Sequence, residues 1–299
     1  LDQFNDTDSS FTTLPVQRPI TIRHLLTHTS GITYGVFNPG KIQALYEKMG
    51  ANNFGLSADM TTEQMADQIA KVPLIFQPGE KYMYGLNMEV LGRIVEVASG
   101  KKLNEYFKEN IMTPLGIEDT GFYLPKSKQD RLVPVYTYDD KGKIIMTADT
   151  EFGKMLEYPK RNDNNHYAGG GGMSGTAMDY LIFIQSLLNE GEYGGERILS
   201  RKTIEVMTSD QLILLNKKGN GYSNIPGITY GLGFSLKTRE GTAQDHKSAG
   251  TYEWGGYFNT KFFIDPEEEL VFVGMTQIVP FQRNDFWTKM YAIIYGSIE

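Results

Sequence analysis

The sequence predicts an α/β (α+β) fold in which an antiparallel sheet flanked by helices stands beside a mostly helical lobe. Two patterns lead to this prediction. Apolar residues recur at helical spacing in several segments of residues 1–190, whereas residues 191–299 contain short runs rich in aromatic and β-branched residues. With 299 residues, 40% of them apolar, the chain can bury a core shared by two lobes. We therefore expect a single domain with two lobes, divided near residue 190.

Several helices are marked by residues that can cap their first turn. Thr21 can cap a helix from Ile22 to His28, and Thr61 can form a capping box with Gln64 in front of a helix over Thr62–Val72. The other helices expected before the sheet cover Lys41–Met49, Leu86–Ala98, Lys102–Ile111, Thr176–Asn189 (with a capping box of Thr176 and Asp179) and a short stretch from Ser200 to Met207.

The helix over Leu86–Ala98 has a strong apolar pattern. Its expected buried face consists of Val90, Leu91, Ile94, Val95 and Val97. Ser99 and Gly100 follow and end it. Ser99 and Lys102 spell S-x-x-K, a spacing at which a serine and a lysine can share a proton, but Gly100 disrupts the helical geometry that would bring them together.

Strands dominate the C-terminal part, and residues 123–165 before it are expected to form loops and short strands. A turn over Asp265–Glu269 joins two of the strands as a hairpin, and helical spacing returns from Phe286 to Ile294. The three expected strands are Tyr230–Lys237, Tyr257–Ile264 and Leu270–Gln277.

Composition excludes several classes of function. The net charge of -7 and the scattered Lys and Arg residues give no basic footprint for nucleic acid. The chain has no cysteine, so disulfides, thiolate nucleophiles and cysteine-ligated metals are excluded. No apolar run approaches the ~18 residues that a membrane span requires. We expect a small-molecule or peptide substrate as partner, and the oligomeric state stays open.

Two sequence patterns could indicate a bound metal or nucleotide, but both fit their motifs poorly. No metal or organic cofactor is therefore expected. His24 and His28 are four residues apart, but Leu25 stands where a metallopeptidase helix needs Glu. The glycines at 170, 172 and 175 fit G-x-G-x-x-G, yet the residues before them form a polar stretch instead of the strand that a dinucleotide site requires. A nucleotide-binding role at this glycine run is a weak alternative.

Four segments together indicate chemistry. They are the stretch I-T-I-R-H-L-L-T-H-T-S-G over 20–31, the stretch F-Q-P-G-E over 76–80 followed by Y-M-Y-G-L-N over 82–87, the stretch A-G-G-G-G-M over 168–173, and the stretch S-A-G-T-Y-E-W-G-G over 248–256. In order and spacing they resemble the β-lactamase-related serine hydrolases. That family includes class C β-lactamases, penicillin-binding proteins, D-alanyl-D-alanine carboxypeptidases, D-aminopeptidases and family VIII-type esterases.

The resemblance implies a site made of three motifs. The first is S-x-x-K, whose Ser is the nucleophile. The second is a Tyr that acts as general base, matched here by Tyr84. The third is a Lys/His-Thr-Gly strand, which is Trp-Gly-Gly in many esterase-like members and matches Trp254, Gly255 and Gly256. The N–H of Tyr257 would then serve as one oxyanion donor, worth roughly 3 kcal/mol of transition-state stabilisation.

The remaining site residues are expected to shape the pocket. They are Tyr252, Ser30 and Tyr34, the last two from the loop after the first histidine-containing segment. Tyr84 needs help as a base, because a phenol has a pKa near 10 and becomes useful at neutral pH only beside a cation. The resemblance assigns that cation to the lysine of S-x-x-K.

The chain departs from the family pattern at three points. Nothing before Ile20 fits S-x-x-K, so the nucleophile and its lysine are expected upstream, together with two N-terminal strands and a helix. Leu86 replaces the Asn of Y-x-N, and Asn87 is one place too far. Trp254 replaces a cation that binds a substrate carboxylate. The last two departures favour an ester or a neutral amide over a β-lactam.

The expected function is therefore acyl transfer to Ser and hydrolysis of an ester, amide or β-lactam carbonyl, with esters favoured. The alternative is a non-catalytic, penicillin-binding-like paralogue that binds a ligand or peptide in the same cleft. A periplasmic or secreted location is expected from the family alone.

Overall fold

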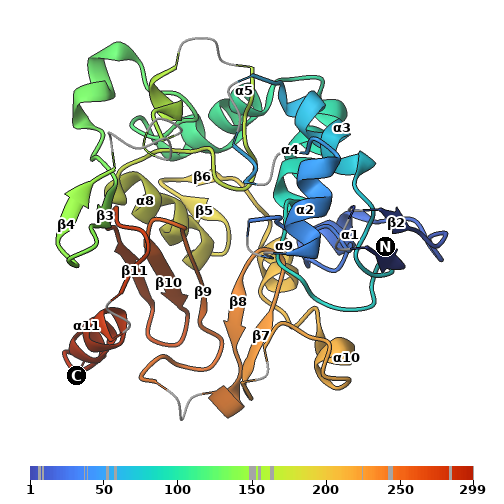
Figure 1. Ribbon diagram of the computed structural model, residues 1–299. Coiled ribbons are helices and arrows are strands. Elements are labelled where there is room, and N and C mark those ends of the chain that lie inside the picture. Colours follow the sequence, from blue (N-terminus) through green and yellow to red (C-terminus); the bar gives the residue numbers. More distant parts are fainter. Residues whose placement is uncertain are drawn as a thin grey trace.

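The computed structural model describes the chain except for residues 6, 7, 9, 37, 39, 52, 53, 57, 58, 148–152, 154, 155, 162–164, 224, 242–244, 283, 284 and 299. Two lobes lie side by side: helices of the N-terminal half form one, and a sheet between helices forms the other (Figure 1). The expected fold class, an antiparallel sheet with flanking helices beside a helical lobe, is confirmed.

The helical lobe follows the capping signals of the sequence. In chain order, the elements up to residue 160 are β1 (Gln3–Phe4), β2 (Phe11–Thr12), α1 (Ile22–Leu26), α2 (Lys41–Lys48), α3 (Thr62–Lys71), α4 (Asn87–Ser99), α5 (Leu103–Phe107), the π-helix η1 (Lys108–Met112), α6 (Thr113–Leu115), η2 (Lys126–Arg131), β3 (Tyr136–Tyr138), β4 (Ile144–Met146) and η3 (Tyr158–Lys160). The β3–β4 hairpin lies with the other lobe (Figure 1), because Tyr136 bridges to Ile278. Thr61 and Gln64 form the expected capping box at α3, whereas the box at α1 pairs Thr21 with His24.

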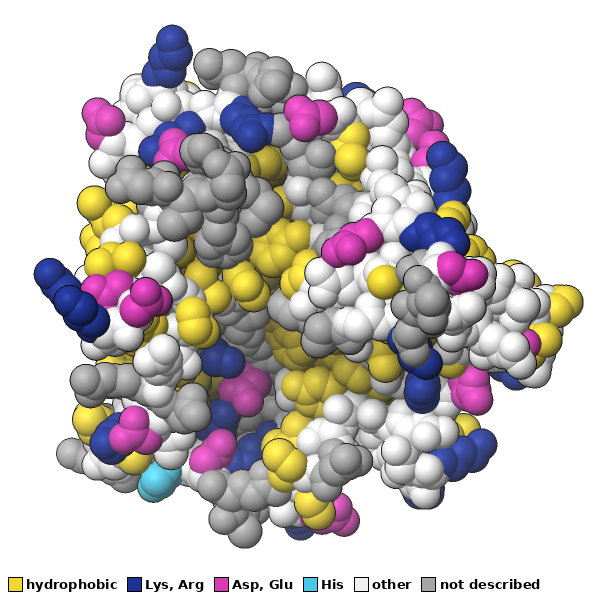
Figure 2. All heavy atoms as spheres, viewed as in Figure 1, with side chains coloured by type: hydrophobic (Ala, Val, Ile, Leu, Met, Phe, Trp, Pro, Cys, Tyr) yellow, Lys and Arg dark blue, Asp and Glu magenta, His cyan; other side chains and the backbone are white. Residues whose placement is uncertain are grey.

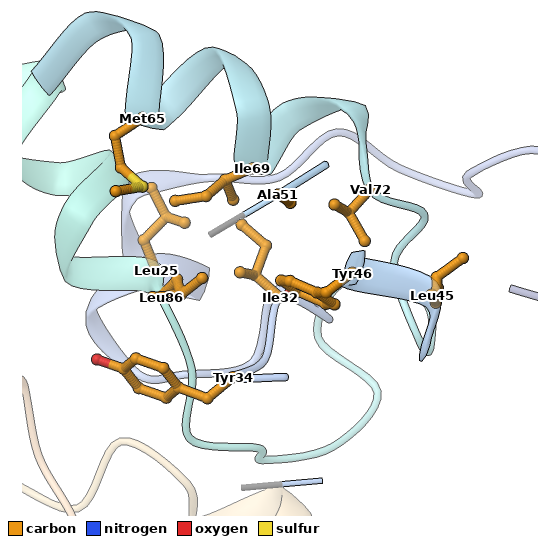
Figure 3. Close-up of a cluster of buried hydrophobic side chains, with 10 residues drawn as sticks. All are labelled: Leu25, Ile32, Tyr34, Leu45, Tyr46, Ala51, Met65, Ile69, Val72 and Leu86. Atoms are coloured by element: carbon orange, nitrogen blue, oxygen red, sulfur yellow. The ribbon is translucent and has the colours of Figure 1, made fainter. Parts of the chain in front are cut away.

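One apolar cluster holds this lobe together, and Figure 3 shows its buried side chains. Leu45, Met65 and Leu86 are fully buried in it. Tyr34 lies at the edge of the cluster with its hydroxyl pointing away from the other side chains (Figure 3). The core therefore positions an aromatic residue that reaches the inter-lobe face.

The second lobe is built on a five-stranded antiparallel sheet in the order β11-β10-β9-β8-β7. Its elements are α8 (Ala177–Leu188), β5 (Glu192–Tyr193), β6 (Glu196–Arg197), α9 (Arg201–Met207), α10 (Ile213–Asn216), β7 (Ile228–Tyr230), β8 (Ser235–Lys237), η4 (Arg239–Gly241), β9 (Tyr252–Gly255), β10 (Lys261–Asp265), β11 (Leu270–Gly274) and α11 (Phe286–Tyr295).

Helices cover both faces of the sheet. On β10, Phe262 packs on Tyr180 of α8, with ring centroids 5.2 Å apart, whereas its neighbour Phe263 packs on Tyr291 of α11 at 5.4 Å. Successive residues of a strand point to opposite faces, so α8 and α11 lie on opposite sides. The division of the lobes at residue 190 stays a prediction, but α8, which precedes it, packs on the sheet.

The expectation of only three strands in this chain was wrong. The stretch expected as one strand over Tyr230–Lys237 is the hairpin of β7 and β8, with Gly233 in its turn at φ 91°. Tyr257 to Thr260 form a turn, and the preceding strand β9 was missed. Among the described residues, no further strand pairs with the outer edges of β7 and β11 in this sheet.

The buried face of α4 also differs from the expectation. Val97 is 67% exposed, whereas Asn87, Glu89, Gly92 and Glu96 are buried. These buried residues have polar partners inside the lobe. Glu96, for instance, accepts a hydrogen bond from the N–H of Leu103 at 3.1 Å. An apolar stripe alone does not reveal such partners.

The predicted capping box at α8 is half formed. The Thr176 hydroxyl accepts the N–H of Asp179 at 3.1 Å, as expected. The Asp179 carboxylate does not return to Thr176, because it accepts the N–H of Asp119 and the hydroxyl of Thr120 instead. Within the described ranges, none of the helices combines the length and the apolarity that crossing a bilayer requires.

The packing of α8 on the sheet yields a stability prediction. Ile184 on α8 is fully buried, so Ile184→Ala is expected to lower the free energy of unfolding by about 2 to 5 kcal/mol, through lost transfer free energy and the cavity left behind. Val97→Ala on α4 is the control, expected to change it by less than about 0.5 kcal/mol. Urea unfolding followed by circular dichroism measures both. Equal effects would contradict the assigned core.

Candidate active site

A cavity of about 1370 Å³ lies between the two lobes. Tyr34, Tyr84 and Glu89 line it from the helical lobe, and Trp254, Gly255, Gly256 and Tyr257 line it from the sheet lobe. Figure 2 shows a hollow in this face with hydrophobic side chains along it and charged side chains at its lower end. Tyr84 and the Gly255-Gly256 pair thus border one shared space, on which the sequence argument depends.

The backbone at Tyr84 is held by a close approach of two chain segments. Gly85 lies against Ile32 and Thr33, and a methyl group at Gly85 would come within 2.3 Å of the Ile32 carbonyl oxygen. The Thr33 hydroxyl donates to the carbonyl of Tyr84 at 3.2 Å. Only glycine at position 85 permits this contact, which fixes where the Tyr84 phenol emerges.

A buried hydrogen-bond network ties the same two segments together. His28 Nδ1 accepts from the Asn87 amide at 2.9 Å and from the N–H of Gly85 at 3.3 Å. The Ser30 hydroxyl donates to the Asn87 side-chain oxygen. Burial lowers the pKa of His28 to about 3, so the imidazole is neutral and accepts at Nδ1. His28 is thus a structural residue, and so is Asn87.

The Tyr84 phenol stands among aromatic partners. Its ring lies 5.3 Å from that of Tyr34 and 5.4 Å from that of Trp254. Burial raises the pKa of Tyr84, while hydrogen bonds from Trp254 and Tyr34 oppose that rise. The phenol is therefore protonated near neutral pH, and it needs an added cation before it can act as a base.

The sheet contributes the end of β9 and the turn after it. Trp254 and Gly255 are the last residues of β9, and Gly256 donates its N–H to the Thr260 carbonyl at 2.9 Å to close the turn. The Tyr257 ring is 43% exposed and packs edge-on against Phe54 at 5.1 Å. The backbone of this turn therefore forms part of the cavity wall.

Two of the expected pocket residues do not line the cavity. Ser30 is fully buried and its hydroxyl is hydrogen-bonded to the Asn87 side chain. Its Oγ also accepts the N–H of Ile32 at 3.0 Å. Tyr252 is 2% exposed and packs edge-on against Phe234 in the sheet core. Ser99 does not line it either; its hydroxyl donates to the Val95 carbonyl at 2.7 Å.

The sequence reasoning missed Glu89, a buried carboxylate in the cavity wall. Its two oxygens accept the N–H groups of Gly169 and Gly170 at 2.8 and 2.9 Å. His166 Nε2 lies 3.8 Å from Glu89 Oε2. Burial raises the pKa of Glu89 to about 8, although the hydrogen bonds from the two glycine N–H groups act to lower it. Glu89 lies five residues after Tyr84 in the sequence, and this spacing does not indicate that its side chain lines the cavity.

The glycine run has a different role from phosphate binding. A methyl group at Gly169 would lie 2.1 Å from the Met88 carbonyl oxygen, so this loop packs directly on α4. The N–H groups of Gly169 and Gly170 already donate to Glu89 and are not available to a phosphate. His24 likewise serves its helix cap, and the described residues contain no cluster of metal-ligating side chains.

Comparisons with known proteins give a family model and several similar proteins. The family model described as Beta-lactamase matches residues 12–291. An uncharacterized protein of Mycobacterium tuberculosis is 30% identical over 274 residues, which are 90% of this chain and 65% of that protein. Lovastatin esterase of Penicillium rubens is 30% identical over 300 residues, 93% of this chain and 69% of that enzyme.

A solved structure extends the similarity to three dimensions. EstCE1, a hydrolase with promiscuous acyltransferase activity, matches with a TM-score of 0.77 at 27% identity, over 94% of this chain and 73% of that chain. The chain thus spans about 65% of the length of the mycobacterial relative and somewhat more of the two enzymes.

Glu89 predicts a pH-dependent stability. A glutamate ionises near pH 4.5 when unfolded and Glu89 near pH 8 when folded, so between these values the folded state holds the extra proton. The free energy of unfolding should therefore fall as the pH rises through this window, by up to ~1.4 kcal/mol per pH unit. Glu89→Gln should remove this contribution, as urea unfolding at pH 5, 6, 7 and 8 would measure.

The control for this experiment is Glu118→Gln at an exposed position, which should keep the wild-type pH profile. Parallel pH profiles for Glu89→Gln and the wild type would show that Glu89 ionises normally. That outcome would contradict its assignment as a buried, protonated carboxyl at neutral pH.

Proposed function

This chain belongs to the Beta-lactamase family, and from that premise we propose that it forms the substrate cleft of a serine hydrolase that cleaves esters by acyl transfer. The observation that carries the proposal is the shared cavity, in which Tyr84 faces the Trp254-Gly255-Gly256 end of β9. Among the similar proteins, the lovastatin esterase supports an ester substrate, and EstCE1, a hydrolase with promiscuous acyltransferase activity, supports acyl transfer.

In this proposal the nucleophilic serine and its lysine come from a segment upstream of the printed residues. The lysine would also supply the cation that the buried phenol of Tyr84 needs. Tyr84 would then accept the serine proton as the serine oxygen attacks the ester carbon.

The remaining steps follow from the placement of β9. The carbonyl oxygen, which becomes negative in the tetrahedral intermediate, would lie at the turn after Gly256, where the Tyr257 N–H and the nucleophile's own N–H donate to it. The alcohol leaves with the proton that Tyr84 returns, and an acyl-enzyme remains. Water then attacks the acyl carbon, and the serine is released together with the acid.

The second candidate is a non-catalytic binding protein of the same family. It is favoured by one observation: the described rings that pack against the Tyr84 ring are aromatic, and burial raises the pKa of its phenol. Reading the gene upstream for S-x-x-K distinguishes the two candidates at once. Labelling of the full-length protein with a fluorophosphonate does so chemically, since a folded protein that is not labelled supports the binding protein.

The proposed base gives a kinetic prediction for the full-length protein. Tyr84→Phe should lower kcat for p-nitrophenyl butyrate by about 10²- to 10⁴-fold, the usual contribution of a general base, without unfolding the cleft. Tyr180→Phe is the matched control, because this tyrosine lines the cavity on the α8 side and packs on Phe262. If the two variants hydrolyse the ester equally well, Tyr84 is not the base.

A further inference from the structure

The Tyr34 hydroxyl lies beside that of Tyr84 on the helical-lobe side of the cavity. Tyr34 is 7% exposed, and its ring is tilted against the Tyr84 ring at a centroid distance of 5.3 Å. Its hydroxyl points away from the apolar cluster (Figure 3) and donates a hydrogen bond to the Tyr84 oxygen. Both residues line the cavity, so this hydrogen bond lies where the proposed base acts.

The backbones that carry the two phenols are tied together. The Asn38 side-chain amide donates to the Tyr34 carbonyl at 2.9 Å and to the Thr33 hydroxyl at 3.0 Å. The Thr33 hydroxyl in turn donates to the Tyr84 carbonyl at 3.2 Å. These three hydrogen bonds limit how far the two tyrosines can move apart, so the contact between their hydroxyls is built into the fold of the helical lobe.

Gly170 lies between the Tyr34 hydroxyl and the buried carboxyl of Glu89. A methyl group at Gly170 would come within 3.1 Å of the Tyr34 hydroxyl oxygen and 2.9 Å of Glu89 Oε1. The two oxygens of Glu89 already accept the N–H groups of Gly169 and Gly170, whereas Tyr34 donates to Tyr84. The glycine loop, which Glu89 holds in place, therefore confines the Tyr34 hydroxyl next to Tyr84.

The Tyr84 oxygen accepts hydrogen bonds from two side chains. Trp254 at the end of β9 donates to it as well as Tyr34. A phenol oxygen has two acceptor positions and one hydrogen. Because both acceptor positions are occupied, the hydrogen of Tyr84 is directed away from Tyr34 and Trp254. Once the phenol is ionised, that third direction is the one from which its oxygen can receive a proton.

The other groups around Tyr84 do not stabilise its anion. Burial raises the pKa of Tyr84 most, and the charges of Glu89 and Tyr222, when these are ionised, raise it further. The His28 ring, 4.7 Å from the Tyr84 ring, is neutral because burial lowers its pKa to about 3. Within the part of the chain that the structure describes, the two hydrogen bonds to the phenol oxygen are therefore the interactions that favour the anion.

We propose that Tyr34 is a positioning residue, whose hydroxyl, confined by Gly170, orients the Tyr84 oxygen so that its third position faces the incoming serine. This inference rests on the proposed function and adds a residue that does not touch the reacting atoms. As the O–H bond of the serine breaks, the O–H bond of Tyr84 forms. Tyr34 keeps its own proton throughout, because burial raises its pKa, and it stabilises the phenolate until that transfer.

The contact can be tested without turnover. NMR of the full-length protein labelled with [ζ-¹³C]tyrosine follows the ionisation of Tyr84, whose signal is identified by its loss in Tyr84→Phe. Tyr34→Phe keeps the ring and removes the donor, so it should raise the midpoint of the Tyr84 titration by about 1 to 2 pH units, the size expected for one hydrogen bond to a charged group. A Tyr84 signal that follows the same curve in both proteins overturns the proposal.

Tyr46→Phe is the control for the segment, since the Tyr46 hydroxyl donates to the Thr33 carbonyl at 2.7 Å. It should lower the melting temperature and leave the Tyr84 midpoint unchanged; an equal shift in Tyr46→Phe would show that loosening the segment suffices, which contradicts a specific role of the Tyr34 hydroxyl.

A pair of glycine variants tests the confinement of the hydroxyl. Gly170→Ala places a methyl group against Tyr34 and Glu89 and should raise the Tyr84 midpoint in the same direction as Tyr34→Phe. Gly171→Ala is the matched control, because a methyl group there has no atom of the described residues within 4 Å. Equal midpoints in the two alanine variants contradict the confinement by Gly170.

Kinetics separate this inference from the proposed function. With p-nitrophenyl butyrate, Tyr34→Phe should lower kcat near neutral pH by about 10- to 100-fold and keep KM within about 3-fold, and the loss should disappear as the pH rises to the new midpoint. An equal loss at every pH indicates a structural role and overturns the proposal. Hydrolysis with unchanged pH profiles contradicts the role of Tyr34 and leaves the hydrolase intact. A shifted Tyr84 titration without hydrolysis contradicts the hydrolase and supports the positioning role.

Discussion

The cleft depends on one buried contact, the hydrogen bonds that His28 Nδ1 accepts from Asn87 and Gly85. They join the segment after α1 to the start of α4 and the residues just before it, and Gly85 allows the close approach of the two backbones. Each such bond contributes only about 0.5 to 1.5 kcal/mol net, but an unpaired buried group costs about 1 to 3 kcal/mol. Because leaving these buried groups unpaired costs more than pairing them gains, the segments are held in the arrangement that pairs them. The Tyr84 side chain therefore points in a fixed direction.

The first turn of α4 is also fixed by an ionisable group. Glu89 accepts two glycine N–H groups from the loop at 169–170 and thereby holds that loop against α4. Desolvation opposes its charge, so the site is most stable when the carboxyl is protonated. His28 and Glu89 thus position the cavity wall by different means: one stays neutral over the whole physiological range, and the other changes charge near its upper end.

The cavity combines aromatic surroundings with cations at its edges. Around Tyr84 the walls are aromatic, which disfavours a phenolate until a cation arrives. At the end of β9, Trp254 faces Tyr84, whereas Lys261 extends across Gly255 on the other face of the sheet. The proposed activation of Tyr84 as a base therefore depends on the upstream lysine.

The sequence by itself determined the local structure and the family resemblance. Helix caps such as Thr61 with Gln64, the helix stop at Gly100 and the order of the four motif segments depend on residues near one another in the chain, and periodicity and capping report such contacts directly. The pairing of Tyr84 with the Gly255-Gly256 pair in one cavity also followed from the motifs, because the resemblance carried the tertiary information.

Only the tertiary structure decided which groups face the cleft and which are used up elsewhere. Ser30 and Tyr252 are packed away from it, Glu89 is buried in its wall, and Lys261 lies across a glycine of the neighbouring strand. Each outcome depends on a partner far away in the chain, such as Asn87 for Ser30 or Gly169 for Glu89. Residue type and spacing do not encode such partners, because burial and strand register arise only when distant segments meet.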